Sequence, residues 1–272
     1  MACMSQHEPN STTAPRRPAG NRFSTKQRII AAAVVLVAVA VGWQVLTIVI
    51  RTERSATRVY SEPITVVQLL SASGEVTIDP APANAPVEVR TSSTYTFRAP
   101  SMVQRVDGNR LVLEDSCGGF RIGKCKVDFR IVAPPGVSIE AKTYNAGLTA
   151  IGVKGDLRLE SNNGRIRVED VYGRLNLTTI NGEIVGTKLQ SFEVQSKTGN
   201  GELSLDFAAS PTNVDAVSVN GSVTVEVPKR DSYKVLADTG NGQTVIDVDT
   251  DPEAQRRITA HTDNGDVKVI RS

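Results

Sequence analysis

The dipeptide Asn-Gly, or a near variant of it, recurs seven times between residues 145 and 265, and each copy precedes a segment with apolar residues at every second position. Successive glycines of this repeat are 17, 18, 19, 20, 21 and 23 residues apart. A repeat of about 20 residues is typical of stacked arrays, and an apolar period of two indicates strands with one buried face. The repeat turns comprise Asn145 and Gly147, Asn163 and Gly164, Asn181 and Gly182, Asn200 and Gly201, Asn220 and Gly221, Asn241 and Gly242, and Asn264 and Gly265.

The turn chemistry predicts how each repeat is built. Asn and Gly both tolerate positive φ, so we expect a tight turn at each copy. A second glycine often starts another strand, as in 153–159 and 171–177, so each repeat holds two short strands. The prediction is an all-β domain folded as a β-solenoid, a β-helix-like stack of repeats. The alternative is an antiparallel β-sandwich in which Asn-Gly marks hairpins.

The second strong feature is an apolar segment from Ile29 to Ile50, 22 residues without a charged side chain. A helix of that length reaches about 33 Å, against a bilayer core of about 30 Å. The segment therefore predicts one transmembrane helix before the β domain. The alternative is a cleaved signal peptide, since Ala38 and Ala40 form a small-x-small pattern. The apolar sequence continues for ten residues beyond Ala40, which favours an uncleaved anchor.

Flanking charge predicts the orientation of this helix. Five basic residues precede it and three follow soon after, which favours a cytoplasmic N-terminus and an extracytoplasmic C-terminal domain at the cell membrane. The polar composition of residues 1–28 predicts a disordered basic cytoplasmic tail. The whole chain has a net charge of +2, and the tail and helix together carry +4, so residues 51–272 carry −2. Such a domain has no electrostatic footprint for nucleic acid.

The remaining chain divides by composition. We expect a juxtamembrane linker at 51–62, an irregular β region at 63–133 and the repeat domain at 134–272, which begins at a Pro-Pro-Gly stop. The lengthening repeat predicts a wider or looser array toward the C-terminus, with loops at 208–215 and 247–253. Strands of the irregular region are expected at 64–70, 76–78, 87–89, 95–97, 111–113 and 127–132.

The cysteines agree with an extracytoplasmic domain. Cys117 and Cys125 are predicted to form a disulfide in an oxidising compartment. Apolar residues alternate on both sides of the pair, as in two strands joined by a hairpin-like loop. The alternatives are two unpaired thiols or a metal site, and the latter is weaker because two cysteines without histidine fall short of four ligands.

No constellation of residues predicts catalysis or a cofactor. His261 lies in a strand-like segment without a nucleophile elbow. The segment 147–154 departs by one residue from a phosphate-binding loop, and 247–251 begins like a calcium loop but has Pro252 where glycine is needed. We therefore predict a protein that is not an enzyme, with no catalytic, cofactor-binding or metal residues.

Several segments together resemble the bacterial "putative adhesin" repeat family, a domain of unknown function. The residues that carry the resemblance are 134–139, 144–147, 155–157, 161–164, 172–175 and 179–182, within a matching stretch from about 127 to 270. The resemblance implies a β-solenoid-like envelope domain, often behind one membrane anchor. It supplies no catalytic or ligand-binding residues.

Two functional hypotheses follow. The first is a membrane-anchored, adhesin-like binding or structural module that presents a polar β surface to an envelope glycan or protein, with self-association through an uncapped solenoid end. An outward hydroxyl ladder would support it, with candidates Thr178, Thr179, Ser196, Thr198, Ser218, Thr239 and Thr262. The alternative is an envelope-stress sensor or signal-transducing membrane protein whose tail contacts a cytoplasmic partner, although the tail contains no recognisable docking motif.

Overall fold

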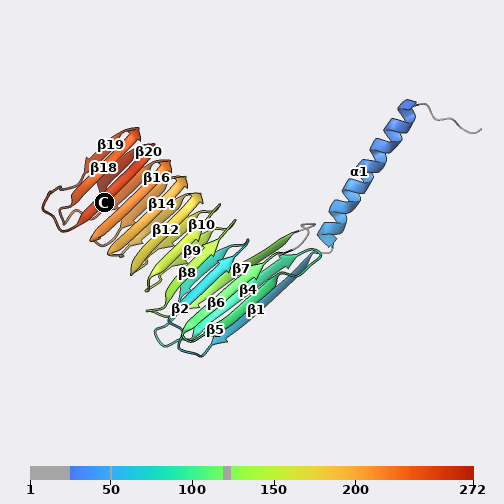
Figure 1. Ribbon diagram of the computed structural model, residues 1–272, viewed down its shortest axis with the longest axis horizontal. Helices are drawn as coiled ribbons and strands as arrows, with labels where there is room; N and C mark the ends of the chain where they lie inside the picture. The colour runs from blue at the N-terminus through green and yellow to red at the C-terminus, as the bar shows by residue number, and fades with distance from the viewer. Residues whose placement is uncertain (1–24, 50, 119–123) are drawn as a thin grey trace, which may run out of the picture. The chain divides into compact units, whose positions relative to one another are not determined.

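The N-terminal part of the chain is one long helix. The computed structural model describes residues 25–49, 51–118 and 124–272, so most of the predicted tail lies outside the described residues (Figure 1). Helix α1 (Thr25–Val49) begins four residues before the predicted segment, and 21 of its residues are apolar enough to cross a membrane. A helix of this kind near an N-terminus is common to membrane anchors and signal sequences. Residues from 50 onward form a separate compact unit.

That unit consists of strands arranged in two sheets. Among the described residues, sheet A has the order β1-β4-β7-β3-β9-β11-β13-β15-β17-β21-β19, and sheet B has the order β18-β20-β16-β14-β12-β10-β8-β2-β6-β5. The strands are β1 (Thr52–Tyr60), β2 (Val66–Ser71), β3 (Val76–Pro80), β4 (Val87–Tyr95), β5 (Ser101–Asp107), β6 (Arg110–Ser116), β7 (Cys125–Ala133), β8 (Ser138–Thr143), β9 (Leu148–Ile151), β10 (Leu157–Ser161), β11 (Ile166–Glu169), β12 (Arg174–Asn181), β13 (Ile184–Leu189), β14 (Glu193–Asn200), β15 (Leu203–Phe207), β16 (Asn213–Asn220), β17 (Val223–Val227), β18 (Lys234–Asn241), β19 (Thr244–Asp247), β20 (Arg257–Asn264) and β21 (Val267–Arg271).

The repeats form a β-solenoid. Each coil has one strand in sheet B, a turn that contains the asparagine, and one strand in sheet A, so β10 pairs in parallel with β8 and β12 while β11 pairs in parallel with β9 and β13. Parallel neighbours require a connection that crosses over, whereas hairpins give antiparallel ones. The solenoid prediction is therefore confirmed, and the antiparallel sandwich is wrong for the repeats.

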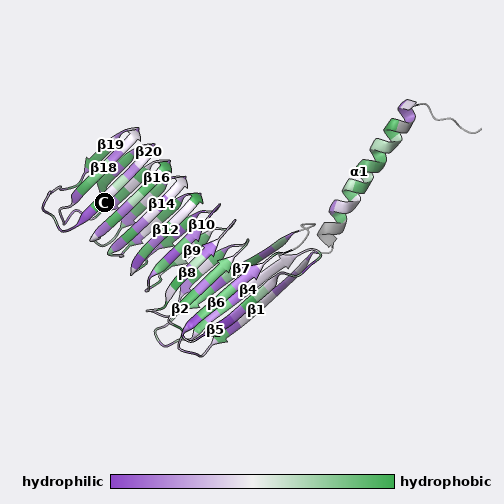
Figure 2. Cartoon of the chain, viewed as in Figure 1, coloured by the Kyte–Doolittle hydropathy of each residue, from purple (hydrophilic) through white to green (hydrophobic). Residues whose placement is uncertain are grey.

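Hydrophobic and hydrophilic residues alternate along the strands (Figure 2), and the hydrophobic side chains fill the space between the two sheets. Leu159, Leu177, Ile166 and Ile184 are fully buried, and they belong to neighbouring coils in matching register. Successive side chains of a strand point to opposite faces, so the apolar residues that recur with a period of two all enter one continuous core. Each coil covers the inner face of the next.

At both ends of the solenoid, the order of coils departs from the order of the chain. The last coil, β20 and β21, lies between the coil of β16 and β17 and the coil of β18 and β19. Likewise the coil of β2 and β3 lies between β8 and β9 on one side and β6 and β7 on the other. The outermost C-terminal coil is therefore β18 with β19, which we call the end coil.

The N-terminal part differs most from the sequence prediction. The predicted linker at 51–62 is wrong, because β1 occupies it and pairs antiparallel with β4. This strand is polar because it is the edge of sheet A, and Tyr60 is the buried residue within it. Strand β5 was not predicted, and it is likewise an exposed edge strand, paired antiparallel with β6. The two short strands expected at 87–89 and 95–97 are replaced by the single strand β4.

The predicted widening toward the C-terminus is wrong. Strands β14, β16 and β20 stay in register, with Asn200 aligned with Asn220 and Asn220 with Asn264. The longer spacing is taken up by the connections at 208–212 and 248–256, which largely confirms the two loops predicted at 208–215 and 247–253. The predicted boundary at 134 also lies within one compact unit, because β3 pairs with β9 across it.

Candidate functional site

The seven repeat asparagines lie in one exposed line along the solenoid. Each of them except Asn145, which only accepts in this ladder, donates a hydrogen bond from Nδ2 to the Oδ1 of its neighbour, at 2.8 to 3.0 Å. The line runs in the order Asn145, Asn163, Asn181, Asn200, Asn220, Asn264 and Asn241. Because these amides bond to one another, the ladder contributes first to holding the coils in register.

The expected positive φ is confirmed at three of the repeat glycines, Gly221, Gly242 and Gly265, and the glycines also meet a second, steric requirement. Among the described residues other than glycine, Asp170 and Lys188 have positive φ and the repeat asparagines do not. A Cβ on Gly182 would lie 2.1 Å from the carbonyl oxygen of Gly164, and one on Gly201 would lie 2.1 Å from that of Gly182. The column of glycines therefore allows close stacking of backbones.

Inward-facing hydroxyl side chains, which we call the hydroxyl column, support the column of glycines from inside the solenoid. Thr179 Oγ1 donates to the carbonyl of Gly164 at 3.1 Å, and Thr198 Oγ1 donates to that of Gly182 at 2.9 Å. The predicted outward hydroxyl ladder is wrong, because most of its members face the core. Those that are buried are Thr179, Ser196, Thr198, Ser218 and Thr262.

A carboxyl group lies at the N-terminal end of the hydroxyl column. Asp115, on β6, is 7% exposed, and neither of its oxygens has a hydrogen bond of normal geometry within the described part of the chain. Burial raises the pKa of Asp115, and the nearby Ser71 hydroxyl and Ala72 backbone N–H offset this only in part. A buried carboxylate without partners destabilises the fold when it is ionised.

Replacing Asp115 with asparagine is therefore expected to stabilise the protein in a pH-dependent manner. The folded pKa is raised, so the folded state holds this proton more tightly and stability falls as the pH rises from the unfolded pKa of about 3.9 through the folded value. At pH 8, Asp115→Asn should raise the free energy of unfolding by about 1 to 3 kcal/mol. The gain should vanish near pH 3. Urea unfolding at both pH values measures it, with the outward neighbour variant Glu114→Gln as control, and an equal gain at both would contradict the assignment.

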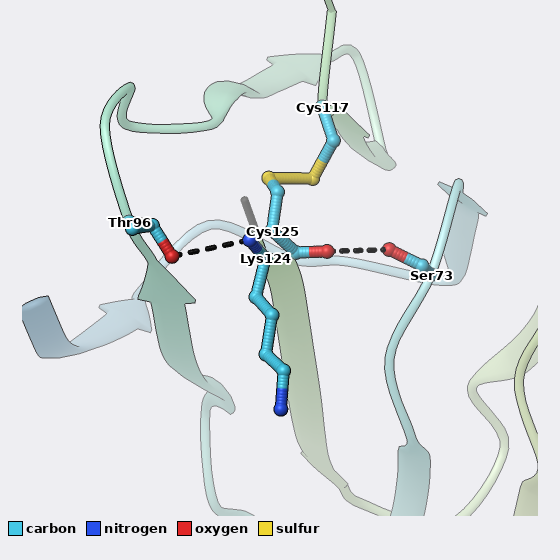
Figure 3. The surroundings of a disulfide bond; sticks show 5 residues. All are labelled: Ser73, Thr96, Cys117, Lys124 and Cys125. Atoms are coloured by element: carbon cyan, nitrogen blue, oxygen red, sulfur yellow. Dashed lines mark hydrogen bonds between the residues drawn. A yellow bond between two sulfur atoms is a disulfide. The ribbon is translucent and has the colours of Figure 1, made fainter. Parts of the chain in front are cut away.

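The two cysteines are joined in the structure. Cys117 and Cys125 form a disulfide with Cα atoms 5.9 Å apart (Figure 3). Ser73 Oγ donates to the carbonyl of Cys125 at 3.2 Å, and the backbone N–H of Lys124 donates to Thr96 Oγ1 at 3.1 Å. The hairpin interpretation is wrong, because β6 belongs to sheet B and β7 to sheet A. The disulfide therefore closes a connection between sheets, of which residues 119–123 lie outside the described residues.

His261 and the calcium-like segment, which the sequence analysis set aside as sites, form charged contacts with neighbouring strands. His261 Nδ1 lies 2.8 Å from Asp238 Oδ2 and its Nε2 lies 3.2 Å from Asp263 Oδ1. Burial alone would lower the pKa of His261, but the two carboxylates raise it overall. Asp247, in the calcium-like segment, pairs with Arg271 at 2.7 Å. In the described ranges, no group of three or more His, Cys, Asp or Glu side chains could hold a metal ion.

The outer face of sheet B contains two adjoining hollows of about 430 and 360 Å³, which we call the sheet B groove. Glu140 and Arg158 line both hollows, so the groove is continuous across β6, β2, β8, β10, β12 and β14. Strand register aligns residues of these strands in two rows, which are polar apart from Val112 and Leu70. The first row is Val112, Gln68, Glu140, Arg158, Asn176 and Gln195, and the second is Glu114, Leu70, Lys142, Glu160, Thr178 and Lys197.

Positive and negative groups alternate in the sheet B groove. Glu160 accepts from Arg158 at 2.7 Å and from Lys142 at 3.3 Å. Partial burial would raise the pKa of Glu160, but its hydrogen bonds with these two cations lower it overall. Glu140 accepts from Arg110 at 3.2 Å. The groove thus offers fixed carboxylates, guanidinium groups and amides without a strong excess of either charge.

The sheet B groove was not predicted from the sequence. Arg158 is 18 residues from Asn176 and 90 from Gln68 along the chain, and only the strand register brings the three side chains to one row. The signal that could have revealed the row is the number of residues between each polar residue and the Asn-Gly turn of its own coil. This spacing places residues in one row only when the order of the coils is also known.

Comparison with a known protein family supports the fold. The sequence profile of a family described as Toastrack DUF4097 matches residues 57–270. No curated protein matches the sequence. Among solved structures, a "putative adhesin" from Bacteroides fragilis is 12% identical with a TM-score of 0.46, over 81% of this chain and 97% of its own. A "putative cell adhesion protein" from Clostridium sporogenes is 12% identical with a TM-score of 0.40, over 81% of this chain and all of its own.

Proposed function

The chain belongs to the Toastrack DUF4097 family, and on that premise we propose that it is a non-catalytic binding module of the cell envelope, which holds an extended glycan in the sheet B groove. The family is one of unknown molecular function. In this proposal, helix α1 anchors the module in the membrane with the N-terminus in the cytoplasm, and the β-solenoid lies outside.

The observation that carries the proposal is the continuity of the sheet B groove. Its two hollows share Glu140 and Arg158, and the groove crosses six strands. Neighbouring strands are about 4.8 Å apart, so the groove extends for roughly 24 Å along the solenoid. A site of that length suits a polymer, whereas a compact small molecule is better held in an enclosed cavity.

The chemistry of the sheet B groove favours a neutral or zwitterionic glycan. Sugar hydroxyls both donate and accept hydrogen bonds. Gln68, Asn176 and Gln195 each use one amide hydrogen within the sheet, toward Glu140, Gln195 and Asp215 respectively, and their remaining amide donor and acceptor capacity lies beside charged groups. The carboxylate of Glu160 stays ionised because two cations hold its pKa low. A strongly anionic polymer would meet Glu140, Glu160 and Glu193 as repulsive groups.

The proposal is tested by sedimentation of the full-length protein in detergent with insoluble cell-wall polysaccharide. We expect saturable retention, and the double variant Arg158→Gln, Glu160→Gln should bind about tenfold more weakly because it removes charge-assisted hydrogen bonds worth roughly 1.4 kcal/mol. Strand β11 offers a matched control, because Arg167 and Glu169 form the same Arg-x-Glu ion pair at 3.0 Å on the outer face of sheet A. Arg167→Gln, Glu169→Gln should bind as the parent does. Equal losses in both variants, or no retention of the parent, would reject the groove as the site.

A further inference from the structure

The end coil leaves the interior of the solenoid open. Val235, Ala237 and Ile246 occupy the positions that Ile258, Ala260 and Val269 occupy in the neighbouring coil. The residues of the neighbouring coil are fully buried, whereas Ile246 is 44% exposed and Val235 and Ala237 are half-buried. The difference arises because no further coil covers the end coil in the described part of the chain.

Strand β18 is also an unprotected edge. It bonds to β20 on one side, and no described strand pairs with its other side. An open edge of this kind offers a row of backbone donors and acceptors to another strand. In sheet A, the edge strand farthest from the end coil is β1, and it carries the charged residues Glu53, Arg54 and Arg58, which discourage such pairing.

The side chains of β18 are complementary to a second copy of the same strand. Antiparallel pairing centred on Leu236 would place Lys234 opposite the Asp238 of the other copy, and this happens twice because the arrangement is symmetric. The same register places Val235 opposite Ala237, so both inward residues remain inward. Leu236, which is 45% exposed and faces outward, would contact its own equivalent.

Neighbouring registers lose this match. Pairing centred on Ala237 would place Lys234 opposite Gly240, and Asp238 opposite Leu236. Lys234 has no ion pair with any described residue, so its charge is available. Asp238 is already 2.8 Å from His261 Nδ1, but its side chain is 73% exposed, so a second cation can approach it. The charges of β18 therefore select one register, and they select a copy of this chain as the partner.

We propose that the end coil is a self-docking surface, through which two copies of this chain join end to end by antiparallel pairing of their β18 strands centred on Leu236. Sheet B then continues from one copy into the other, and the inward residues Val235 and Ala237 of the two end coils cover one another. This interface is separate from the sheet B groove and does not depend on what the groove binds.

Disulfide trapping tests the register directly. In full-length protein in detergent, with Cys3 replaced by serine, Leu236→Cys would place two thiols in directly opposed positions, with Cβ atoms about 5 Å apart. Mild oxidation should give a covalent dimer. Thr259→Cys is the matched control, because Thr259 is aligned with Leu236 on the covered strand β20. Its two copies would be three strand spacings apart, about 14 Å, which is too far to form a bond.

A charge exchange tests the same interface without cysteine. Lys234→Glu should weaken self-association about tenfold in analytical ultracentrifugation, because two attractive pairs become repulsive. Adding Asp238→Lys should restore it, since the exchanged charges again match. The proposal would be overturned if Leu236→Cys gave no covalent dimer, if it crosslinked to a different protein, or if Thr259→Cys formed as much dimer as Leu236→Cys. It would also be overturned if Lys234→Glu left self-association unchanged.

Discussion

Replacing Gly182 with alanine is expected to lower the free energy of unfolding by on the order of 4 kcal/mol. The added Cβ would lie 2.1 Å from the carbonyl oxygen of Gly164 in the neighbouring coil. Both clashing partners are held by backbone, so the clash is relieved only if the two coils move apart. The same carbonyl accepts the hydroxyl of Thr179 at 3.1 Å, so separation also breaks the buried hydroxyl column. Urea unfolding followed by far-UV circular dichroism measures the loss.

Gly147, in the first repeat turn, provides the control for this experiment. A Cβ on Gly147 would meet its nearest heavy atom, the carbonyl oxygen of Arg165, at 3.5 Å, which is an ordinary contact. Gly147→Ala should therefore be neutral, or stabilising by about 0.4 to 1 kcal/mol through the unfolded chain. If both variants lost the same stability, turn conformation would explain the glycines better than stacking does.

The coil itself could be predicted from the sequence because its cause is local. Apolar residues with a period of two identify Leu159 and Leu177 as core positions, and each Asn-Gly marks where the chain crosses from sheet B to sheet A. The conformational reason given for Asn-Gly holds at Gly221, Gly242 and Gly265, but it is wrong for the asparagines, and it is not the whole reason for the glycines. The steric requirement comes from the neighbouring coil, as at Gly182 and Gly164, and no single repeat contains that information.

The order of the coils could not be predicted because the repeats are nearly equivalent partners. Val214 on β16 pairs with Ile258, although Val235 on the preceding coil offers a similar apolar side chain at the same position. A pattern that all coils share cannot specify which coil is adjacent to which. The strand β1 was missed for a related reason, since an edge strand with an exposed face lacks the apolar alternation by which strands are recognised.

The candidate site was hidden by the same dependence on long-range register. The rows of the sheet B groove contain one or two residues from each coil, such as Glu140, Arg158 and Asn176. Alternating charges at outward positions are also what any soluble solenoid needs. The two hollows distinguish these rows from the rest of the surface, because their lining residues identify the strands that the groove crosses.

Truncation of the core at Leu177 is expected to be the second most damaging single change. Leu177 is fully buried, and its in-register neighbours are Leu159 and Ser196. Leu177→Ala should lower the free energy of unfolding by about 3 kcal/mol, the loss of buried apolar atoms plus the cost of the cavity that remains. Collapse around the cavity is restricted because parallel hydrogen bonds on both sides of β12 hold the strand spacing, and Ser196 is too small to fill the space.

The adjacent residue gives a control on the same strand. Thr178 points out of the solenoid between Glu160 and Lys197, so Thr178→Ala should change the free energy of unfolding by less than about 0.5 kcal/mol. Urea unfolding of both variants, in full-length protein in detergent, measures the difference. A loss below about 1 kcal/mol for Leu177→Ala would mean that the coils shift to fill the cavity. Because Gly182→Ala is predicted to be severe on the ground that the coils cannot shift, that result would contradict both predictions together.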